Sequence, residues 1–225
     1  MNTEVLRQAP LFSGLDDEAA EALSASMLEN RLRRGEVLFH EGDEGDRLYI
    51  VTDGKIKLGR TSADGRENLL AILGPGQMFG ELSLFDPGPR SATVTAVTDC
   101  TMRSLGHDEL GRWLNGRPEV ARGLLAQLAA RLRRANDVVA DLVFSDVPGR
   151  VAKALLDLSQ RFGRTADDGV HVHHDLTQEE LAQLVGASRE TVNKALADFA
   201  SRGWLRLEAR SVVIMDLERL KRRAR

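Results

Sequence analysis

Apolar residues recur with a regular spacing in the middle of the chain, between Pro118 and Phe144. The repeating positions are Leu125, Leu128, Leu132, Ala135, Val139 and Leu142, alternately three and four residues apart. A seam with this period keeps facing one partner only when two helices wind around each other. The pattern therefore predicts a central helix that pairs with the same helix of a second copy, in a homodimer. A single amphipathic helix lying on its own domain is the alternative.

Charged residues beside this seam predict a face of the helix that is turned to water: Arg131, Arg133, Arg134, Asp137 and Asp141. Pro118 suits the first helical turn, where the missing N–H would have no partner in any case. The central helix should therefore begin at Pro118 and present one apolar and one solvated face.

Before this helix the pattern changes to short apolar runs. A helix is predicted over 16–28, with Asp16 or Asp17 as its cap and Ala19, Ala20, Leu23 and Met27 on one face. Strands follow at 37–39, 48–51, 56–58, 69–73, 92–97 and 101–105. Breaks such as Asp53–Gly54 and Asp64–Gly65 are typical of hairpins. The region 34–106 should form a small antiparallel barrel or roll.

After the central helix, residues 145–150 contain proline and glycine and are expected to form a hinge before a helix over 151–162. Thr177 and Glu180 have the spacing of a capping box that opens a helix ending at Gly186. Ser188 should cap a second helix over 189–201. Two helices joined by a short glycine turn are typical of a helix-turn-helix, although an ordinary helical hairpin is the alternative.

The second of these helices has one inward face and one polar face. Val192, Leu196 and Phe199 fall on the inward face, whereas the polar face carries Arg189, Glu190, Asn193 and Lys194. Apolar runs at 205–207 and 212–214 could form a two-stranded wing around 208–211. Residues 189–225 contain ten Lys or Arg against five Asp or Glu, which fits a polyanionic partner such as DNA.

Composition excludes several classes of protein. The chain is 42% hydrophobic and 29% charged, which is ordinary for a soluble protein of one or two domains. No stretch is long and apolar enough to span a membrane, and residues 1–30 do not resemble a signal peptide, so we expect a cytoplasmic protein without a membrane partner. The single cysteine, Cys100, excludes an intrachain disulfide and is expected to be a small apolar strand residue.

Candidate binding chemistry lies between Phe79 and Ala92. Gly80 lets a ligand approach the backbone, and the short helical turn expected after it would offer free N–H groups to an anion. Arg90 supplies a planar fork of donors that suits phosphate. Glu81 would repel a phosphate but could accept a hydrogen bond from a sugar hydroxyl. Phosphate plus sugar indicates a nucleotide, and a structural ion pair between Glu81 and Arg90 is the alternative.

Several segments of the chain, including these residues, resemble a known protein family. The segment 45–51 with Gly54, the segment 79–82 and the segment 90–92 resemble the cyclic-nucleotide-binding domain of the cyclic-AMP receptor protein family of bacterial transcription factors. Residues 187–192 resemble the family's recognition helix. The resemblance covers nearly the whole chain and implies an eight-stranded β-roll that holds cyclic AMP.

Carried over residue by residue, the resemblance implies phosphate contacts from Gly80 and Ser91, charge pairing from Arg90, and a ribose 2'-hydroxyl bond from Glu81. The expected effector site comprises Gly80, Glu81, Leu82, Arg90, Ser91, Ala135 and Asn136. The chain departs from the family at Ala135, where a threonine usually bonds the adenine amino group, while Asn136 stands where a partner-subunit residue reaches across. The expected DNA-binding residues are Thr177, Gln178, Ser188, Arg189, Glu190, Asn193 and Lys194.

The sequence therefore predicts an α+β protein with three parts. These are a cyclic-nucleotide-binding β-roll over 1–117, a dimerisation helix over 118–144 and a winged helix-turn-helix over 145–225. Its predicted function is a cyclic-AMP-responsive, homodimeric transcription factor that binds palindromic double-stranded DNA, with RNA polymerase as a further implied partner. The alternatives are a DNA-binding regulator with weak or no dependence on cyclic AMP, and a cyclic-nucleotide sensor that controls a protein partner.

An enzyme and a metal site are not expected. The roll contributes only His40 and His107, too few for a histidine-rich metal centre. His171, His173 and His174 cluster within 169–175, but further ligands are not evident nearby, so a solvated strand or turn is predicted there.

Overall fold

The computed structural model of the protein describes residues 3–12, 14–62, 65, 67–86, 88–115 and 117–224. Asp64 of the predicted Asp64–Gly65 turn lies outside these residues. The chain divides into two compact units, one built from the described residues up to 60 and from 71–134, the other from those of 61–70 and from 135 onwards. The boundaries expected from the sequence, 1–117, 118–144 and 145–225, stay a prediction.

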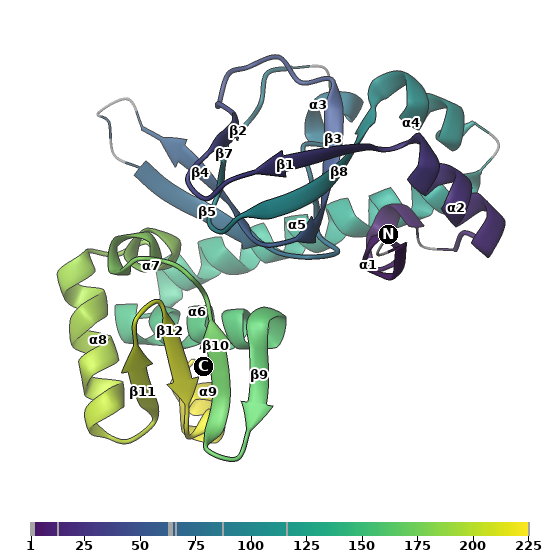
Figure 1. Cartoon of the computed structure of the whole chain (residues 1–225). Helices are drawn as coiled ribbons and strands as arrows, with labels where there is room; N and C mark the ends of the chain where they lie inside the picture. Colours follow the sequence, from purple (N-terminus) through teal and green to yellow (C-terminus); the bar gives the residue numbers. More distant parts are fainter. Residues whose placement is uncertain are drawn as a thin grey trace. The chain divides into compact units, whose positions relative to one another are not determined.

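The first unit contains two four-stranded sheets except for Thr61 and residues 67–70, which are grouped with the second unit (Figure 1). One sheet has the order β1-β8-β3-β6, formed by Leu28–Leu32, Cys100–Gly106, Arg47–Asp53 and Met78–Phe79. The other has the order β2-β7-β4-β5, formed by Val37–Phe39, Thr93–Ala96, Ile56–Thr61 and Glu67–Leu73. All six predicted strands are present, and β1 and β6 are additional.

Strand β3 contributes to two cores because its side chains alternate between its faces. Tyr49 and Val51 join a cluster with residues of both sheets, including Phe79 and Val94, so this core lies between the sheets. Leu48 and Ile50 face the opposite way and pack with helical residues. The roll is thereby closed on one side by its second sheet and covered on the other by helices.

The longer helices expected in this unit are both present. Its helical elements are α1 (Thr3–Arg7), the 3₁₀ turn η1 (Pro10–Phe12), α2 (Asp17–Ser26), α3 (Leu82–Phe85), α4 (His107–Leu114) and α5 (Pro118–Phe144). Asp16 caps α2, since its Oδ1 accepts a hydrogen bond from the Ala19 N–H at 2.8 Å. Helix α5 spans the predicted residues and contributes to both units.

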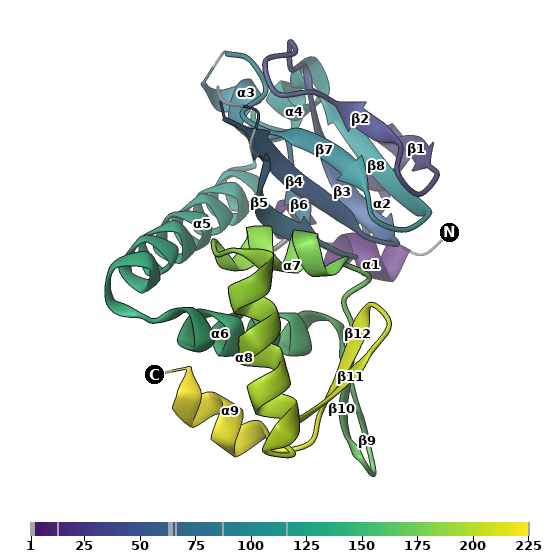
Figure 2. The same cartoon turned by 90° about the vertical axis from the view of Figure 1, so that its left-hand side faces the viewer.

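The second unit contains α6 (Val147–Phe162), α7 (Gln178–Val185), α8 (Arg189–Ser201) and α9 (Leu217–Arg223) (Figure 2). Its antiparallel sheet has the order β11-β12-β10-β9, formed by Leu205–Glu208, Ser211–Ile214, Gly169–His173 and Gly163–Ala166. Leu155 of α6, Val172 of β10, and Leu196 and Phe199 of α8 are buried, and α6 contacts both α8 and β10. The predicted wing is confirmed as β11 and β12.

The predicted hinge over 145–150 is wrong in its length. Helix α6 already begins at Val147, because Asp146 caps it by accepting a hydrogen bond from the Gly149 N–H at 2.9 Å. Pro148 is tolerated in this first turn, where its missing N–H needs no partner. Only Ser145 and Asp146 separate α5 from α6.

The histidine-rich segment is less solvated than expected. Gly169–His173 forms the strand β10, which pairs with both β9 and β12. His174 is 5% exposed, and its Nδ1 accepts a hydrogen bond from the Leu176 N–H at 3.1 Å. The prediction of a solvated turn is therefore wrong at His174.

Candidate functional site

A pocket in the first unit collects most of the predicted effector residues. It is lined by Phe39, Leu58, Phe79, Gly80, Leu82, Ser83, Arg90, Ser91, Ala92, Val94 and Arg131. Glu81 lies in the same segment and is fully buried. Ala135 and Asn136 are exposed residues of α5 and are not among the lining residues. The structure thus brings five of the seven predicted residues together.

Gly80 has a backbone conformation that favours glycine, with φ +78°. A Cβ atom there would lie 2.9 Å from Arg90 Nη1 and 3.0 Å from the Arg47 carbonyl oxygen. Both contacts are closer than real Cβ atoms normally show. Gly80 is therefore required by its own turn and by the close passage of the Arg90 side chain.

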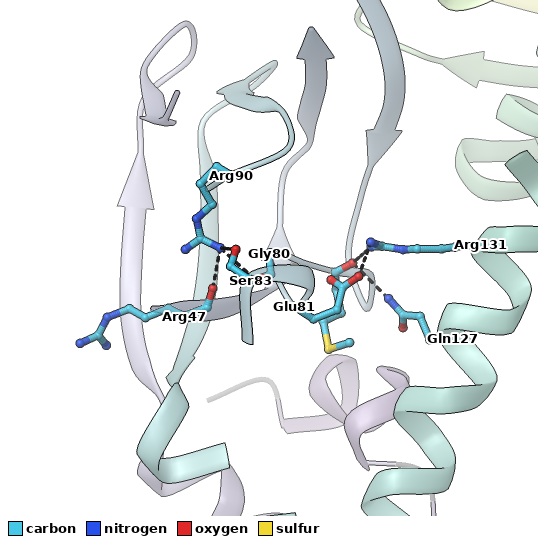
Figure 3. Close-up of polar contacts among 8 residues, drawn as sticks. Arg47, Gly80, Glu81, Ser83, Arg90, Gln127 and Arg131 are labelled. Atoms are coloured by element: carbon cyan, nitrogen blue, oxygen red, sulfur yellow. Dashed lines mark hydrogen bonds and ion pairs between the residues drawn. The ribbon is translucent and has the colours of Figure 1, made fainter. Parts of the chain in front are cut away.

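Arg90 is 4% exposed and is held by the walls of the pocket. Its Nη1 donates hydrogen bonds to the carbonyl oxygens of Arg47 at 2.9 Å and Gly80 at 2.8 Å (Figure 3). Its guanidinium carbon lies 4.2 Å from the centre of the Phe39 ring. Burial lowers the pKa of Arg90 from its ordinary value, and the nearby Tyr49, Asp46 and Glu81 oppose that effect. Arg90 is thus a fixed, largely desolvated cation.

Glu81 is paired with Arg131 of α5, which corrects two expectations. Arg131 Nη1 lies 2.5 Å from Glu81 Oε1, and Arg131 Nη2 also donates to the Met78 carbonyl oxygen. Figure 3 shows Arg90 and Arg131 approaching the segment of Gly80 and Glu81 from opposite sides. The sequence predicts Arg131 on the solvated face of the helix and gives Arg90 as the alternative ion-pair partner of Glu81. Both expectations are wrong, because Arg131 is the residue that pairs with Glu81.

Three further residues of the site were missed. Ser83 Oγ accepts a hydrogen bond from Arg90 Nη1 at 3.3 Å, Phe39 stacks against the Arg90 guanidinium, and Gln127 of α5 donates to the Met78 carbonyl oxygen at 3.2 Å. Ser83 could have been found, since it follows Glu81 by two residues. Phe39 and Gln127 come from distant segments that only the folded roll brings close.

The site contains buried polar atoms without hydrogen-bond partners on both an acidic and a basic side chain. Glu81 Oε2 and Arg90 Nε are buried and have no hydrogen-bond partner among the described residues. A buried polar group without a partner costs about 1 to 3 kcal/mol, so such groups are typically completed by a ligand, an ion or an ordered water. A ligand with an anionic group for Arg90 and a hydroxyl for Glu81 would satisfy both. The residues therefore fit a nucleotide.

The second unit positions the predicted DNA-binding residues on α7 and α8. The capping box is confirmed, because Glu180 N–H donates to Thr177 Oγ1 at 3.1 Å and Thr177 N–H donates to Glu180 Oε2 at 2.8 Å. Gly186 ends α7 with φ +70°, and Ser188 caps α8 by accepting from the Thr191 N–H. The structure therefore contains a helix-turn-helix.

The outer face of α8 carries mixed charges. Arg189, Glu190 and Lys194 are exposed, and Lys194 Nζ pairs with Glu190 Oε1 at 2.7 Å. Asn193 is half-buried, and its Oδ1 has no partner among the described residues. A ligand of α8 would have to compete with the exposed Glu190–Lys194 pair, whereas Arg189 forms no ion pair within the described part of the chain.

The wing is tied to the rest of its sheet by charge pairs. Arg206 of β11 pairs with Asp168 at 2.8 Å and with Glu208 at 3.3 Å, and Asp168 also contacts His171 at 2.6 Å. The pKa of Asp168 is lowered to about 2, first by its hydrogen bond with His171 and second by its hydrogen bond with Arg206. The two-residue turn at the tip contains Arg210, with φ +59°.

Neither a metal centre nor a membrane span is found in the described part of the chain. No three His, Cys, Asp or Glu side chains converge there as metal ligands would. No helix of that part is long and apolar enough to cross a membrane.

Two family models match the chain over the two regions just described. Residues 29–116 match the model of a cyclic nucleotide-binding domain. Residues 149–223 match the model of a Crp-like helix-turn-helix domain. The first match contains all the residues that line the pocket around Arg90 except Arg131, and the second contains α7 to α9 with most of α6.

Known proteins resemble the chain along most of its length. A CRP-like cAMP-activated global transcriptional regulator of Mycobacterium tuberculosis (strain H37Rv) is 57% identical over 222 residues, 99% of each chain. The cyclic AMP receptor protein of Thermus thermophilus is 39% identical over 212 residues, 94% of each. Among solved structures, FixK2 of Bradyrhizobium japonicum has a TM-score of 0.78 at 26% identity, covering 87% of this chain and 96% of its own. The Thermus thermophilus catabolite activator protein has a TM-score of 0.56 at 37% identity, covering 96% and 98%.

Proposed function

The chain belongs to the family of CRP-like transcriptional regulators, and from this premise we propose that it is a homodimer that binds cyclic AMP and recognises palindromic DNA. The family consists of regulators and not of enzymes. One observation carries the proposal of a nucleotide ligand. Arg90 lines the pocket and Glu81 lies next to its lining residue Gly80, and each has a buried atom without a hydrogen-bond partner among the described residues.

Each pocket residue has a proposed role toward cyclic AMP. The cyclic phosphate is anionic and would pair with Arg90, which is already desolvated and held over Phe39. The ribose 2'-hydroxyl would donate to Glu81, while Gly80, Leu82 and Ser91 would contact the phosphate and sugar. Ala135 and Asn136 of α5 would lie near the base. The chemistry is binding and orientation only, since no bond of the nucleotide is broken.

The DNA-binding residues have roles that follow from their positions. Arg189 and Glu190 stand in the first turn of α8, the part of a recognition helix that contacts base edges in the major groove. Arginine suits the O6 and N7 acceptors of guanine, and glutamate accepts from the amino group of cytosine. Thr177, Gln178, Ser188, Asn193 and Lys194 would contact phosphates or neighbouring bases. A two-fold dimer would then read a palindrome with G·C pairs in each half-site, and the resemblance to the family implies a site that looks like TGTGA with TCACA.

Nucleotide and DNA binding would be coupled through α5. Arg131 and Gln127 of this helix contact the segment of Met78 and Glu81 next to the pocket. The same helix ends at Phe144, two residues before α6 begins. A ligand that binds Glu81 would therefore contact a residue that is already paired with the helix joining both units. By thermodynamic linkage, nucleotide and DNA must then raise each other's affinity by the same factor.

Two further assignments belong to the proposal. A transcription regulator acts where the chromosome lies, so we place the protein in the cytoplasm of a bacterium. RNA polymerase is the proposed protein partner, because a regulator bound next to a promoter can contact the enzyme that starts transcription.

Isothermal titration calorimetry of the purified protein with cyclic AMP, cyclic GMP and 5'-AMP tests the nucleotide site. We expect both cyclic nucleotides to bind and 5'-AMP to bind at least tenfold more weakly, because the pocket should be shaped to the ring phosphate. Equal affinities for all three nucleotides, or no binding of cyclic AMP, would contradict the proposal.

A further inference from the structure

The last helix of the chain is anchored on α6. Helix α9 lies beside α6 in Figures 1 and 2, and both helices belong to the second unit. Leu220 is completely buried and Ala224 is 8% exposed, so α9 has an apolar side that is covered. Asp216 caps its start by accepting a hydrogen bond from the Arg219 N–H at 2.9 Å. The helix is therefore a packed element of this unit, and its last turn has a defined place.

Arg223, in that last turn, forms an ion pair with Asp146. Arg223 Nη2 donates to Asp146 Oδ2 at 2.6 Å, while Asp146 Oδ1 accepts from the Gly149 N–H at 2.9 Å. Each carboxylate oxygen thus has its own partner. The hydrogen bond from Arg223 is the first cause, and that from Gly149 the second, by which the pKa of Asp146 is lowered.

The approach of the two helices is close at Gly149. A Cβ atom at Gly149 would lie 3.4 Å from Arg223 Nη1 and 3.5 Å from the Arg223 carbonyl oxygen. Gly149 itself is buried. The end of α9 thus packs directly on the first turn of α6, and the Arg223 contact is part of that packing.

The first turn of α6 also contains Arg150, whose hydrogen bonds connect this turn with the helices on either side of it in the sequence. Arg150 Nη1 donates to the Ser145 carbonyl oxygen at 2.9 Å, at the end of α5. Its Nε and Nη2 donate to the carbonyl oxygens of Val185 at 3.1 Å and Gly186 at 3.2 Å. These two carbonyls end α7, and α8 begins three residues later. The turn that Arg223 contacts is thus hydrogen-bonded both to the end of α5 and to the end of α7, just before the recognition helix begins.

We propose that Arg223 is a positioning residue for DNA binding, which acts by holding Asp146 and with it the first turn of α6. Its loss leaves every base contact in place but lets the junction of α5 and α6 move relative to α7 and α8. Binding of DNA must then order this junction, and affinity falls. This inference rests on the DNA-binding function proposed above.

The variants separate this role from simpler ones. Arg223→Gln removes the charge, and Arg223→Lys keeps it. Asp146→Asn removes the charge of the partner but keeps an oxygen that can cap α6, since asparagine caps helices as well as aspartate does. Arg222→Gln is the matched control, because Arg222 is the adjacent residue of the same helix turn and is exposed.

The experiment is a fluorescence anisotropy titration of full-length protein with a palindromic duplex containing TGTGA and TCACA, with and without cyclic AMP, at several salt concentrations. We expect Arg223→Gln and Asp146→Asn each to weaken DNA binding about two- to fivefold, the range set by a partly exposed ion pair. The double variant should lose no more than either single variant, because both remove one contact. Arg223→Lys should recover part of the loss, and Arg222→Gln should have a smaller effect.

Salt dependence distinguishes positioning from direct contact. A phosphate contact contributes about one unit to the slope of log affinity against log salt concentration. If Arg223 positions α6, the slope in Arg223→Gln equals that of the unmutated protein. A slope reduced by about one, additive losses in the double variant, or unchanged affinity in Arg223→Gln would each overturn this inference. Absence of DNA binding by the unmutated protein would instead overturn the proposed function.

Discussion

Arg131 and Glu81 form an ion pair at the edge of the pocket, with 2.5 Å between Arg131 Nη1 and Glu81 Oε1. Glu81 is fully buried, whereas the Arg131 side chain is 34% exposed. The pair occupies one carboxylate oxygen and leaves Oε2 without a partner among the described residues. In the proposed nucleotide site, a ribose hydroxyl would donate to this second oxygen while Arg131 keeps the first.

The first prediction concerns Arg131→Leu. A buried carboxylate that loses its cation is destabilising, by about 3 to 5 kcal/mol for a fully buried pair. Because Arg131 is partly exposed and solvent screens the pair, we expect about 1 to 3 kcal/mol, together with weaker cyclic AMP binding. Urea unfolding and calorimetry measure the two effects. Arg133→Leu, an exposed neighbour on the same helix, is the control, and equal effects of both substitutions would remove the role of the pair.

The second prediction is that Arg90→Leu weakens cyclic AMP binding at least tens of times. Truncating one partner of a desolvated charge pair costs about 2 to 5 kcal/mol, much of it from the charge left behind. Arg90→Lys should rescue only part of the loss, because an ammonium group lacks the planar fork that lies over Phe39. Calorimetry gives the affinities. Unchanged affinity in Arg90→Leu would mean that Arg90 only supports the roll.

The third prediction concerns the helix seam. Leu125, Leu132, Val139 and Leu142 are between 52% and 65% exposed in the single chain, an apolar stripe that a second copy would cover. Leu132→Glu places a charge at the seam of both copies and should convert a dimer to monomers at micromolar concentration, as measured by light scattering. Ala130→Glu adds the same charge on the opposite side of the helix and should leave the dimer intact. A monomeric unmutated protein would remove the coiled-coil interpretation.

The fourth prediction assigns sequence reading to Arg189. Arg189→Ala should cost about 1 to 3 kcal/mol on the palindromic site and relax preference at one guanine of each half-site. Titrations with duplexes substituted at single base pairs measure this. Arg202→Ala removes an exposed cation at the other end of α8, which already pairs with Asp198 at 2.8 Å, and serves as the control. A uniform loss over all duplexes would make Arg189 a phosphate contact.

The fifth prediction comes from Ala135, which cannot hydrogen-bond the adenine amino group. One net hydrogen bond is worth about 0.5 to 1.5 kcal/mol, roughly a two- to tenfold effect. Ala135→Thr should therefore raise the preference for cyclic AMP over cyclic GMP and make DNA binding depend more on the nucleotide. Calorimetry with both nucleotides and DNA titration with and without them provide the test. If neither quantity changes, residue 135 does not govern the response and Asn136 becomes the candidate.

The sequence predicts elements well where local chemistry decides them. The capping box of Thr177 and Glu180, the cap at Ser188 and the helix from Pro118 to Phe144 are all found as expected, because each depends on residues a few positions apart. Strand β1 was missed because its sequence, Leu-Glu-Asn-Arg-Leu, lacks the β-branched residues and alternation that mark a strand. Only its pairing with β8 makes it one.

The site shows the same limit. Gly80, Glu81 and Arg90 are predictable because they stand close together and have recognisable chemistry. Arg131 is fifty residues from Glu81, and beside an apolar seam an arginine looks like a solvated residue. Its pairing with Glu81 depends on where α5 passes the roll, which no local pattern encodes. Arg90 is a possible partner of Glu81 on the sequence alone, because the sequence contains no signal for which of several cations lies near this carboxylate.

The measurement that tests the whole account most directly is the linkage between nucleotide and DNA. The dissociation constant for the palindromic duplex would be measured with and without saturating cyclic AMP, and that for cyclic AMP with and without the duplex. The account predicts that each ligand tightens the binding of the other and that the two factors are equal and greater than one. A protein whose affinity for this duplex is the same with and without saturating cyclic AMP would contradict it.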